Sequence, residues 1–178
     1  MPNRFFAICI LVFMLEGCGR HASLRRHEIA PSPATGNELR LDGYWYTIKK
    51  SEIRPDSVVT RYFFFKNGKV LFGFNCSPYE LNYRESDFTD EFFKQQLTAR
   101  YNANLTNFAV DGGRIEFERI SPVQDYPHGI FQGIILNDST FVIKIERNCG
   151  NIETVNEKYH FKAFPIPEKY QSPPIEMP

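Results

Sequence analysis

The side chains of this chain that could carry chemistry are its cysteines, histidines and closely spaced carboxylates. No Gly-rich phosphate loop, Gly-x-Ser-x-Gly elbow or His-Glu-x-x-His zinc motif occurs in the sequence. Two of the four histidines, His128 and His160, lie beyond residue 40 and are too far apart in sequence to form a local metal motif. Glu116 and Glu118 alternate along a strand pattern, where carboxylates ordinarily face water. We therefore expect no catalytic residues, no metal and no cofactor, and predict that the protein is not an enzyme.

Cys18 ends a segment that has the layout of an export signal. Arg4 gives a positive start, and an unbroken apolar run of eleven residues follows at positions 5–15. The run is too short to cross a bilayer, which requires ~20 residues. Leu15, Gly17 and Cys18 resemble the lipobox of bacterial lipoproteins, in which the cysteine is diacylated and becomes the first residue. The resemblance implies that residues 1–17 are a signal peptide and that Cys18 carries lipid; a plain secretory signal and a buried amino-terminal helix are the alternatives.

Cys76 and Cys149 are the cysteines that remain if Cys9 leaves with the signal and Cys18 is acylated. An even remainder in an oxidising compartment predicts one disulfide between them. Closing so long a loop would stabilise the domain by ~4 kcal/mol in the chain-entropy account. Two separate thiols are the alternative.

Net charge limits the classes of partner. The chain has 21 basic and 21 acidic residues, and this balance argues against a nucleic-acid partner. Arg20, Arg25 and Arg26 follow the proposed lipid closely, where they would lie near anionic headgroups or form a merely solvated linker. The basic residues directly after Cys18 favour a lipid-anchored protein of the bacterial cell envelope, on the outer membrane and facing the periplasm.

Composition divides the mature chain into three parts. Residues 18–40 are rich in Pro, Ser, Thr and Gly and predict a flexible, lipidated tether. Residues 41–164 carry the strand patterns and predict one folded domain. Residues 165–178 contain five prolines and predict an extended or disordered tail.

Strand signals dominate the folded domain. Asn67-Gly68, residues 111–113 and residues 137–139 supply the turns of three hairpins. Residues 86–101 place Phe88, Phe92, Leu97 and Tyr101 at near-helical spacing and predict an amphipathic helix. The eight expected strands lie at residues 43–50, 57–66, 69–76, 105–110, 114–120, 129–136, 140–146 and 157–164.

Eight antiparallel strands with one apolar face can wrap into a barrel, which removes the exposed edges of an open sheet. Gly43 and Trp45, at the start of the first strand, resemble the Gly-x-Trp signature of lipocalins. The segments around Asn67-Gly68, Gly113 and Asn137 are similar to lipocalin-like domains of bacterial lipoproteins. The resemblance implies an all-β fold, an eight-stranded up-and-down lipocalin-like barrel with one helix inserted between strands three and four.

The interior of so small a barrel is either filled by its own side chains or leaves room for one small ligand. The first alternative predicts a solid-core interaction module that binds an envelope protein through residues 77–104 or the tail. The second, which we prefer from the sequence, predicts a membrane-anchored carrier of a small apolar ligand such as a lipid. Its candidate pocket residues, chosen by alternation, are Trp45, Phe63, Phe65, Phe72, Phe74, Phe131 and Phe141.

Overall fold

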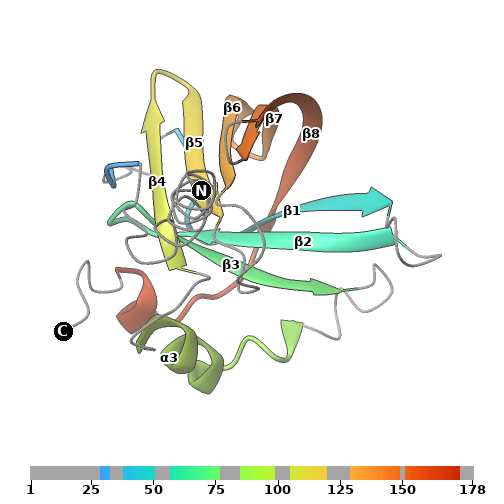
Figure 1. Ribbon diagram of the computed structural model, residues 1–178. Coiled ribbons are helices and arrows are strands. Elements are labelled where there is room, and N and C mark those ends of the chain that lie inside the picture. Colours follow the sequence, from blue (N-terminus) through green and yellow to red (C-terminus); the bar gives the residue numbers. More distant parts are fainter. Residues whose placement is uncertain are drawn as a thin grey trace, which may run out of the picture.

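The predicted all-β barrel is confirmed. The structure is a computed structural model that describes residues 29–32, 38–50, 57–76, 85–98, 105–119, 129–148 and 151–172. Eight antiparallel strands form a closed barrel in which each strand pairs with its neighbours in sequence and β8 returns to β1 (Figure 1). Antiparallel closure leaves one face of every strand for the interior.

Most strand bounds agree with the sequence patterns. The strands are β1 (Gly43–Lys50), β2 (Ser57–Phe64), β3 (Lys69–Cys76), β4 (Leu105–Asp111), β5 (Arg114–Arg119), β6 (Gly129–Asn137), β7 (Thr140–Asn148) and β8 (Asn151–Ala163). The expected start of the last strand at Glu157 is wrong, because β8 begins at Asn151 and pairs along β7 from there. Four of the six residues at positions 151–156 are polar, so a hydrophobicity pattern does not reveal this half of the strand.

The predicted hairpin turns depend on glycines with positive φ. Gly68 has φ 78° and closes the turn between β2 and β3, where Phe65 N donates to Lys69 O at 2.8 Å. A Cβ at Gly68 would also lie 2.8 Å from Ser32 N, so both the turn and the neighbouring chain require glycine.

Gly43 allows the barrel to close. A Cβ at this position would lie 2.2 Å from Lys162 O on β8. The first glycine of the Gly-x-Trp motif therefore has a packing role here, because it lets β1 and β8 approach each other.

Two apolar clusters lie on opposite sides of the barrel wall. The inner cluster takes residues from all eight strands: Trp45, Tyr62, Phe64, Val70, Phe108, Ile115, Phe117, Phe131, Phe141, Ile143 and Tyr159, together with Leu39 before β1. The outer cluster lies between the wall and a helix: Tyr44, Phe63, Phe65, Leu71, Phe88, Phe93, Leu97, Leu105 and Ile166. Strand β2 is therefore buried on both faces.

The helix inserted between β3 and β4 is confirmed, but it is shorter than its pattern. α3 runs over Asp90–Thr98, and Thr89 caps it by accepting a hydrogen bond from Phe92 N at 3.2 Å. Phe88 lies before the helix and is still buried in the outer cluster. The cap fixes the start of the helix at Asp90 and not at residue 86, where the predicted segment begins, and Tyr101 lies outside the described residues.

The segment after β8 packs on α3, so the start of the expected tail is ordered. The 3-10 helix η3 (Glu168–Tyr170) places the Tyr170 ring 5.8 Å from that of Phe93 in a stacked arrangement. Lys169 Nζ lies 2.7 Å from Asp90 Oδ1, and Ile166 is buried. Figure 1 shows η3 and α3 side by side next to β3.

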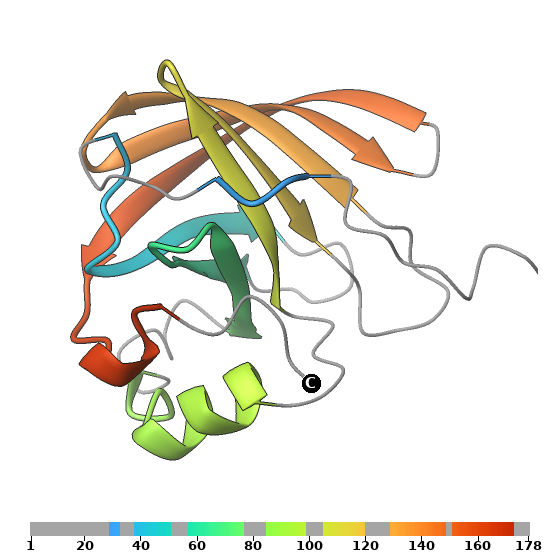
Figure 2. The same cartoon turned by 90° about the vertical axis from the view of Figure 1, so that its left-hand side faces the viewer.

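Residues 29–32, which the sequence assigns to the tether, cross the outer surface of β4 and β5 (Figure 2). Ile29 N donates to Glu118 Oε1 at 2.7 Å, and Asn107 Nδ2 donates to Ile29 O at 2.8 Å. Ser32 N donates to Phe108 O at 3.2 Å. We call residues 29–32 the strap, because these buried polar contacts fix it to the wall.

Candidate functional site

The inner cluster fills the part of the barrel that its members occupy. Phe117 has Tyr62, Phe131 and Phe64 around it at ring-centroid distances of 4.9, 5.1 and 5.5 Å. Phe141 lies 4.8 Å from both Trp45 and Tyr159. Rings at these separations are in contact, so this region is packed core.

One end of the interior is closed around Trp45. Trp45 Nε1 donates to Arg40 O at 2.9 Å, and the Arg40 guanidinium lies 4.1 Å from the centre of the Phe161 ring. Arg40 is also paired with Asp42 at 2.6 Å. An arginine from before β1 thus covers the tryptophan end of the barrel.

The predicted pocket residues do not form one group. Trp45, Phe131 and Phe141 belong to the inner cluster, and Phe72 is partly buried against it. Phe74 lies on β3, but its side chain is outside the described part of the chain.

The assignment of Phe63 and Phe65 to the barrel interior is wrong, because both belong to the outer cluster beneath α3. The register explains this result. Tyr62 pairs with Phe72 and Phe64 with Val70, and directly paired residues share a face. Tyr62 and Phe64 are therefore the inward residues of β2.

Polar side chains gather at the other end of the interior. Arg119 on β5 lies 5.6 Å from the Phe131 ring, and Tyr159 Oη donates to Glu157 Oε2 at 3.3 Å. Burial raises the pKa of Tyr62 to about 12, against the opposing effect of the Arg119 charge. Burial likewise raises the pKa of Tyr159 well above 10. Both hydroxyls are protonated at neutral pH and can serve as hydrogen-bond donors.

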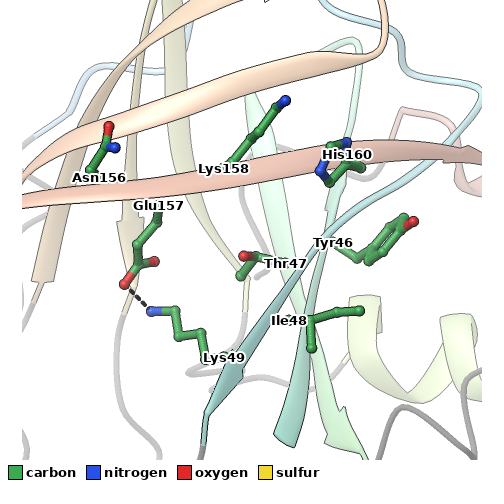
Figure 3. A pocket seen from close by; sticks show the side chains of 8 residues that line it. All are labelled: Tyr46, Thr47, Ile48, Lys49, Asn156, Glu157, Lys158 and His160. Atoms are coloured by element: carbon green, nitrogen blue, oxygen red, sulfur yellow. Dashed lines mark ion pairs between the residues drawn. The ribbon is translucent and has the colours of Figure 1, made fainter.

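A cleft opens in the wall where β1 and β8 part (Figure 3). Its volume is about 520 Å³, and it is lined by Tyr46, Thr47, Ile48, Lys49, Asn156, Glu157, Lys158 and His160. Figure 3 shows Glu157 reaching from β8 toward Lys49 on β1, with which it forms an ion pair. The His160 ring lies on the outer side, 6.0 Å from that of Tyr46.

The side chains that line this cleft are mostly polar or charged. Within the described residues, no group of three or more His, Cys, Asp or Glu side chains is placed to hold a metal. The cleft lining contains two lysines, the Glu157 carboxylate, the His160 imidazole, an amide, two hydroxyls and one apolar side chain, Ile48, which is 53% exposed. The sequence did not reveal this site, because the site depends on where the backbone pairing between β1 and β8 ends. No local sequence motif predicts that position.

A second cluster of polar side chains lies outside the barrel and was not revealed by the sequence. It consists of Tyr44, Glu85 and Lys162. The Tyr44 hydroxyl donates to Glu85, and Lys162 Nζ lies 2.8 Å from Glu85 Oε1. Burial acts to raise the pKa of Glu85, but hydrogen bonds from Lys162 and Tyr44 hold it below its ordinary value. These contacts tie the segment before α3 to β1 and β8.

Several predicted sites lie outside the described residues. Cys18 and Cys149 are among them, as is the side chain of Cys76 at the end of β3. Lipidation and the disulfide therefore stay predictions. No helix of the described ranges is long and apolar enough to span a bilayer.

The shape defines the class of protein as a small antiparallel barrel of eight strands. Comparison of the chain with protein-family models, curated proteins and solved structures finds no match. The lipocalin resemblance therefore stays a prediction from sequence motifs, because an eight-stranded barrel does not by itself identify the family.

Proposed function

We propose that this protein is an envelope lipoprotein whose solid barrel is a binding module for another envelope protein, and not an enzyme. The observation that carries this proposal is the packed inner cluster, in which Phe117 and Phe141 are each 0% exposed and contact rings from other strands. Because aromatic side chains of the protein itself fill the barrel, a partner would bind at the outer wall or at the ends of the strands.

The proposed anchor is a lipid on Cys18, on the periplasmic side of the outer membrane. Ten residues separate Cys18 from Ile29, the first residue of the strap. That length reaches at most about 36 Å when fully extended. The proposal thus keeps the barrel close to the bilayer, where its partner would also be found.

A carrier of a small apolar ligand is the second candidate function, and the cleft between β1 and β8 favours it. Its volume of about 520 Å³ is within the range of small-molecule sites. Its lining is largely polar, so a lipid would have to place a headgroup there. The filled inner cluster leaves the interior near Phe117 without space for an acyl chain.

Native mass spectrometry of the protein, extracted gently from its own membrane, tests both candidates. The solid-module proposal predicts an acylated chain that starts at Cys18 and carries no further small molecule. A bound molecule that leaves on denaturation would support the carrier instead. Alkylation of the denatured, unreduced protein reports separately on Cys76 and Cys149, since a disulfide would leave both unlabelled.

A further inference from the structure

The ladder between β1 and β8 ends early. These strands pair from Gly43↔Ala163 to Tyr46↔His160, although β1 continues to Lys50 and β8 starts at Asn151. We call Thr47–Lys50 and Asn151–Tyr159 the open seam. Each of these stretches is hydrogen-bonded on its other side, to β2 and β7 respectively. In the part of the chain that the structure describes, neither stretch has a ladder partner along the seam.

A side-chain contact spans the seam where backbone pairing has stopped. Continuing the β1–β8 register by three positions beyond Tyr46↔His160 would place Lys49 opposite Glu157. These two residues form an ion pair across the gap. The strands thus keep their alignment while their backbone N–H and C=O groups face the cleft.

We propose that the open seam binds an extended acidic peptide of a partner protein as an added β-strand. This inference rests on the proposed function and names the class of partner. Unpaired edge groups are a template for another strand, and strand addition satisfies them through main-chain hydrogen bonds. A lipid headgroup has no repeating backbone with which to satisfy such a row of groups.

Charge selects the chemistry of the peptide. The register places four cations on the outer face beside the seam, and no acidic side chain of β1, β7 or β8 shares that face among the described residues: Lys50, Lys144, Arg147 and Lys158. Like charges would oppose pairing of this edge with the same edge of a second copy. An acidic strand would instead be attracted.

Exposed apolar side chains mark where the outer face of such a strand would make contact. Ile48 is 53% exposed on β1, and Ile152 is 69% exposed at the start of β8. Both point outward, as Lys158 does. A fitting strand therefore alternates acidic residues with small ones and has an apolar residue near each end.

The test uses the full chain and a synthetic peptide of about nine residues, the length of the open edge of β8. Glu alternates with Thr in the peptide, and Ile stands at each end. Fluorescence anisotropy measures its binding, and hydrogen exchange should show new protection at residues 151–159 or 47–50. Two further peptides carry N-methyl groups at odd or at even residues. Since alternate N–H groups point to one edge, one of the two should bind at least about tenfold more weakly and the other like the parent.

Charge reversal provides the matched protein variants. Lys50→Glu with Lys158→Glu should weaken binding of the parent peptide by about tenfold or more. Lys158→Glu alone and Arg114→Glu, at an exposed position on β5 away from the seam, each change the net charge by the same amount; the first should weaken binding and the second should leave it within about twofold.

Three results would overturn the inference. They are equal binding of both N-methylated peptides, seam amides already protected in the free protein, and binding to anionic vesicles without binding to the peptide. Native mass spectrometry judges the proposed function separately, because a small molecule inside the barrel would refute the solid module whatever the peptide does.

Discussion

Replacing Phe117 with alanine tests whether the barrel interior is solid. Phe117 is 0% exposed and has three ring partners within 5.5 Å. Removing a buried Phe side chain from a packed core costs about 3 to 5 kcal/mol, and the loss of these ring contacts favours the upper part of that range. Because domains of this size are stable by about 5 to 15 kcal/mol, the variant should still fold.

Urea denaturation of the wild type and Phe117→Ala, followed by Trp45 fluorescence, gives the difference in the free energy of unfolding. A thermal melt should show a decrease in Tm on the order of 15 °C. Leu136→Ala is the control, because Leu136 is 57% exposed on β6 and its removal should change stability by less than about 0.5 kcal/mol.

A cost below about 1.5 kcal/mol for Phe117→Ala would refute the solid core, because it would mean that Phe117 already borders a void or a ligand space. Phe72→Ala should cost less than Phe117→Ala, since Phe72 is only partly buried against the inner cluster.

Two further predictions concern the polar ties outside the barrel. Glu85→Gln should cost about 1 kcal/mol at pH 7, a value reduced for the partial exposure of the Lys162–Glu85 pair. Because the folded-state pKa of Glu85 lies below 4.5, this contribution is present above pH 4.5 and is lost as the pH falls through the folded-state pKa. The urea midpoints of the wild type and Glu85→Gln should therefore converge in acid, and a constant gap would contradict the assignment. Asn107→Ala removes the acceptor of Lys69 Nζ, at 2.8 Å, and the donor to Ile29 O, and should cost about 2 to 4 kcal/mol. Hydrogen exchange should then show the strap released while β5–β8 stay protected; an unchanged strap would mean that the bonds to Glu118 and Phe108 O are enough to hold it.

The sequence predicts the number of strands and their turns because these depend on local signals. Asn67-Gly68 and Gly112-Gly113 require positive φ, and the structure gives φ 78° at Gly68 and 54° and 76° at the other pair. Closure into a barrel is expected from eight antiparallel strands, most of which alternate between apolar and polar residues. The early start of β8 could not be read in the same way, because its first residues are polar and mostly exposed.

The error over Phe63 and Phe65 has a different cause. A run of apolar residues in β2 has no alternation to read, since α3 buries its outer face and the barrel buries its inner one. The predicted two-residue turn at Asn67-Gly68 would pair Lys66 with Lys69 and therefore Phe63 with Phe72. In the structure Phe65 N donates to Lys69 O and Phe64 pairs with Val70, so the loop has three residues. This shift of one residue in register moves Phe63 and Phe65 to the outer face, and it leaves Phe72 on the same face as Tyr62 and Phe64.

The strap decides which side of the barrel a lipid anchor would hold toward the membrane. It is fixed to the outer surface of β4 and β5, and β4 and β8 are four strands apart in either direction around the ring. If Cys18 carries the lipid as proposed, the ten residues between Cys18 and Ile29 join the strap wall to the membrane, and the open seam lies on the opposite side of the barrel from that connection. A carrier that takes lipid from its own membrane would need its opening on the membrane side, whereas an edge that receives a strand from a partner must be accessible from the aqueous side. The position of the strap therefore favours a peptide over a lipid as the occupant of the seam.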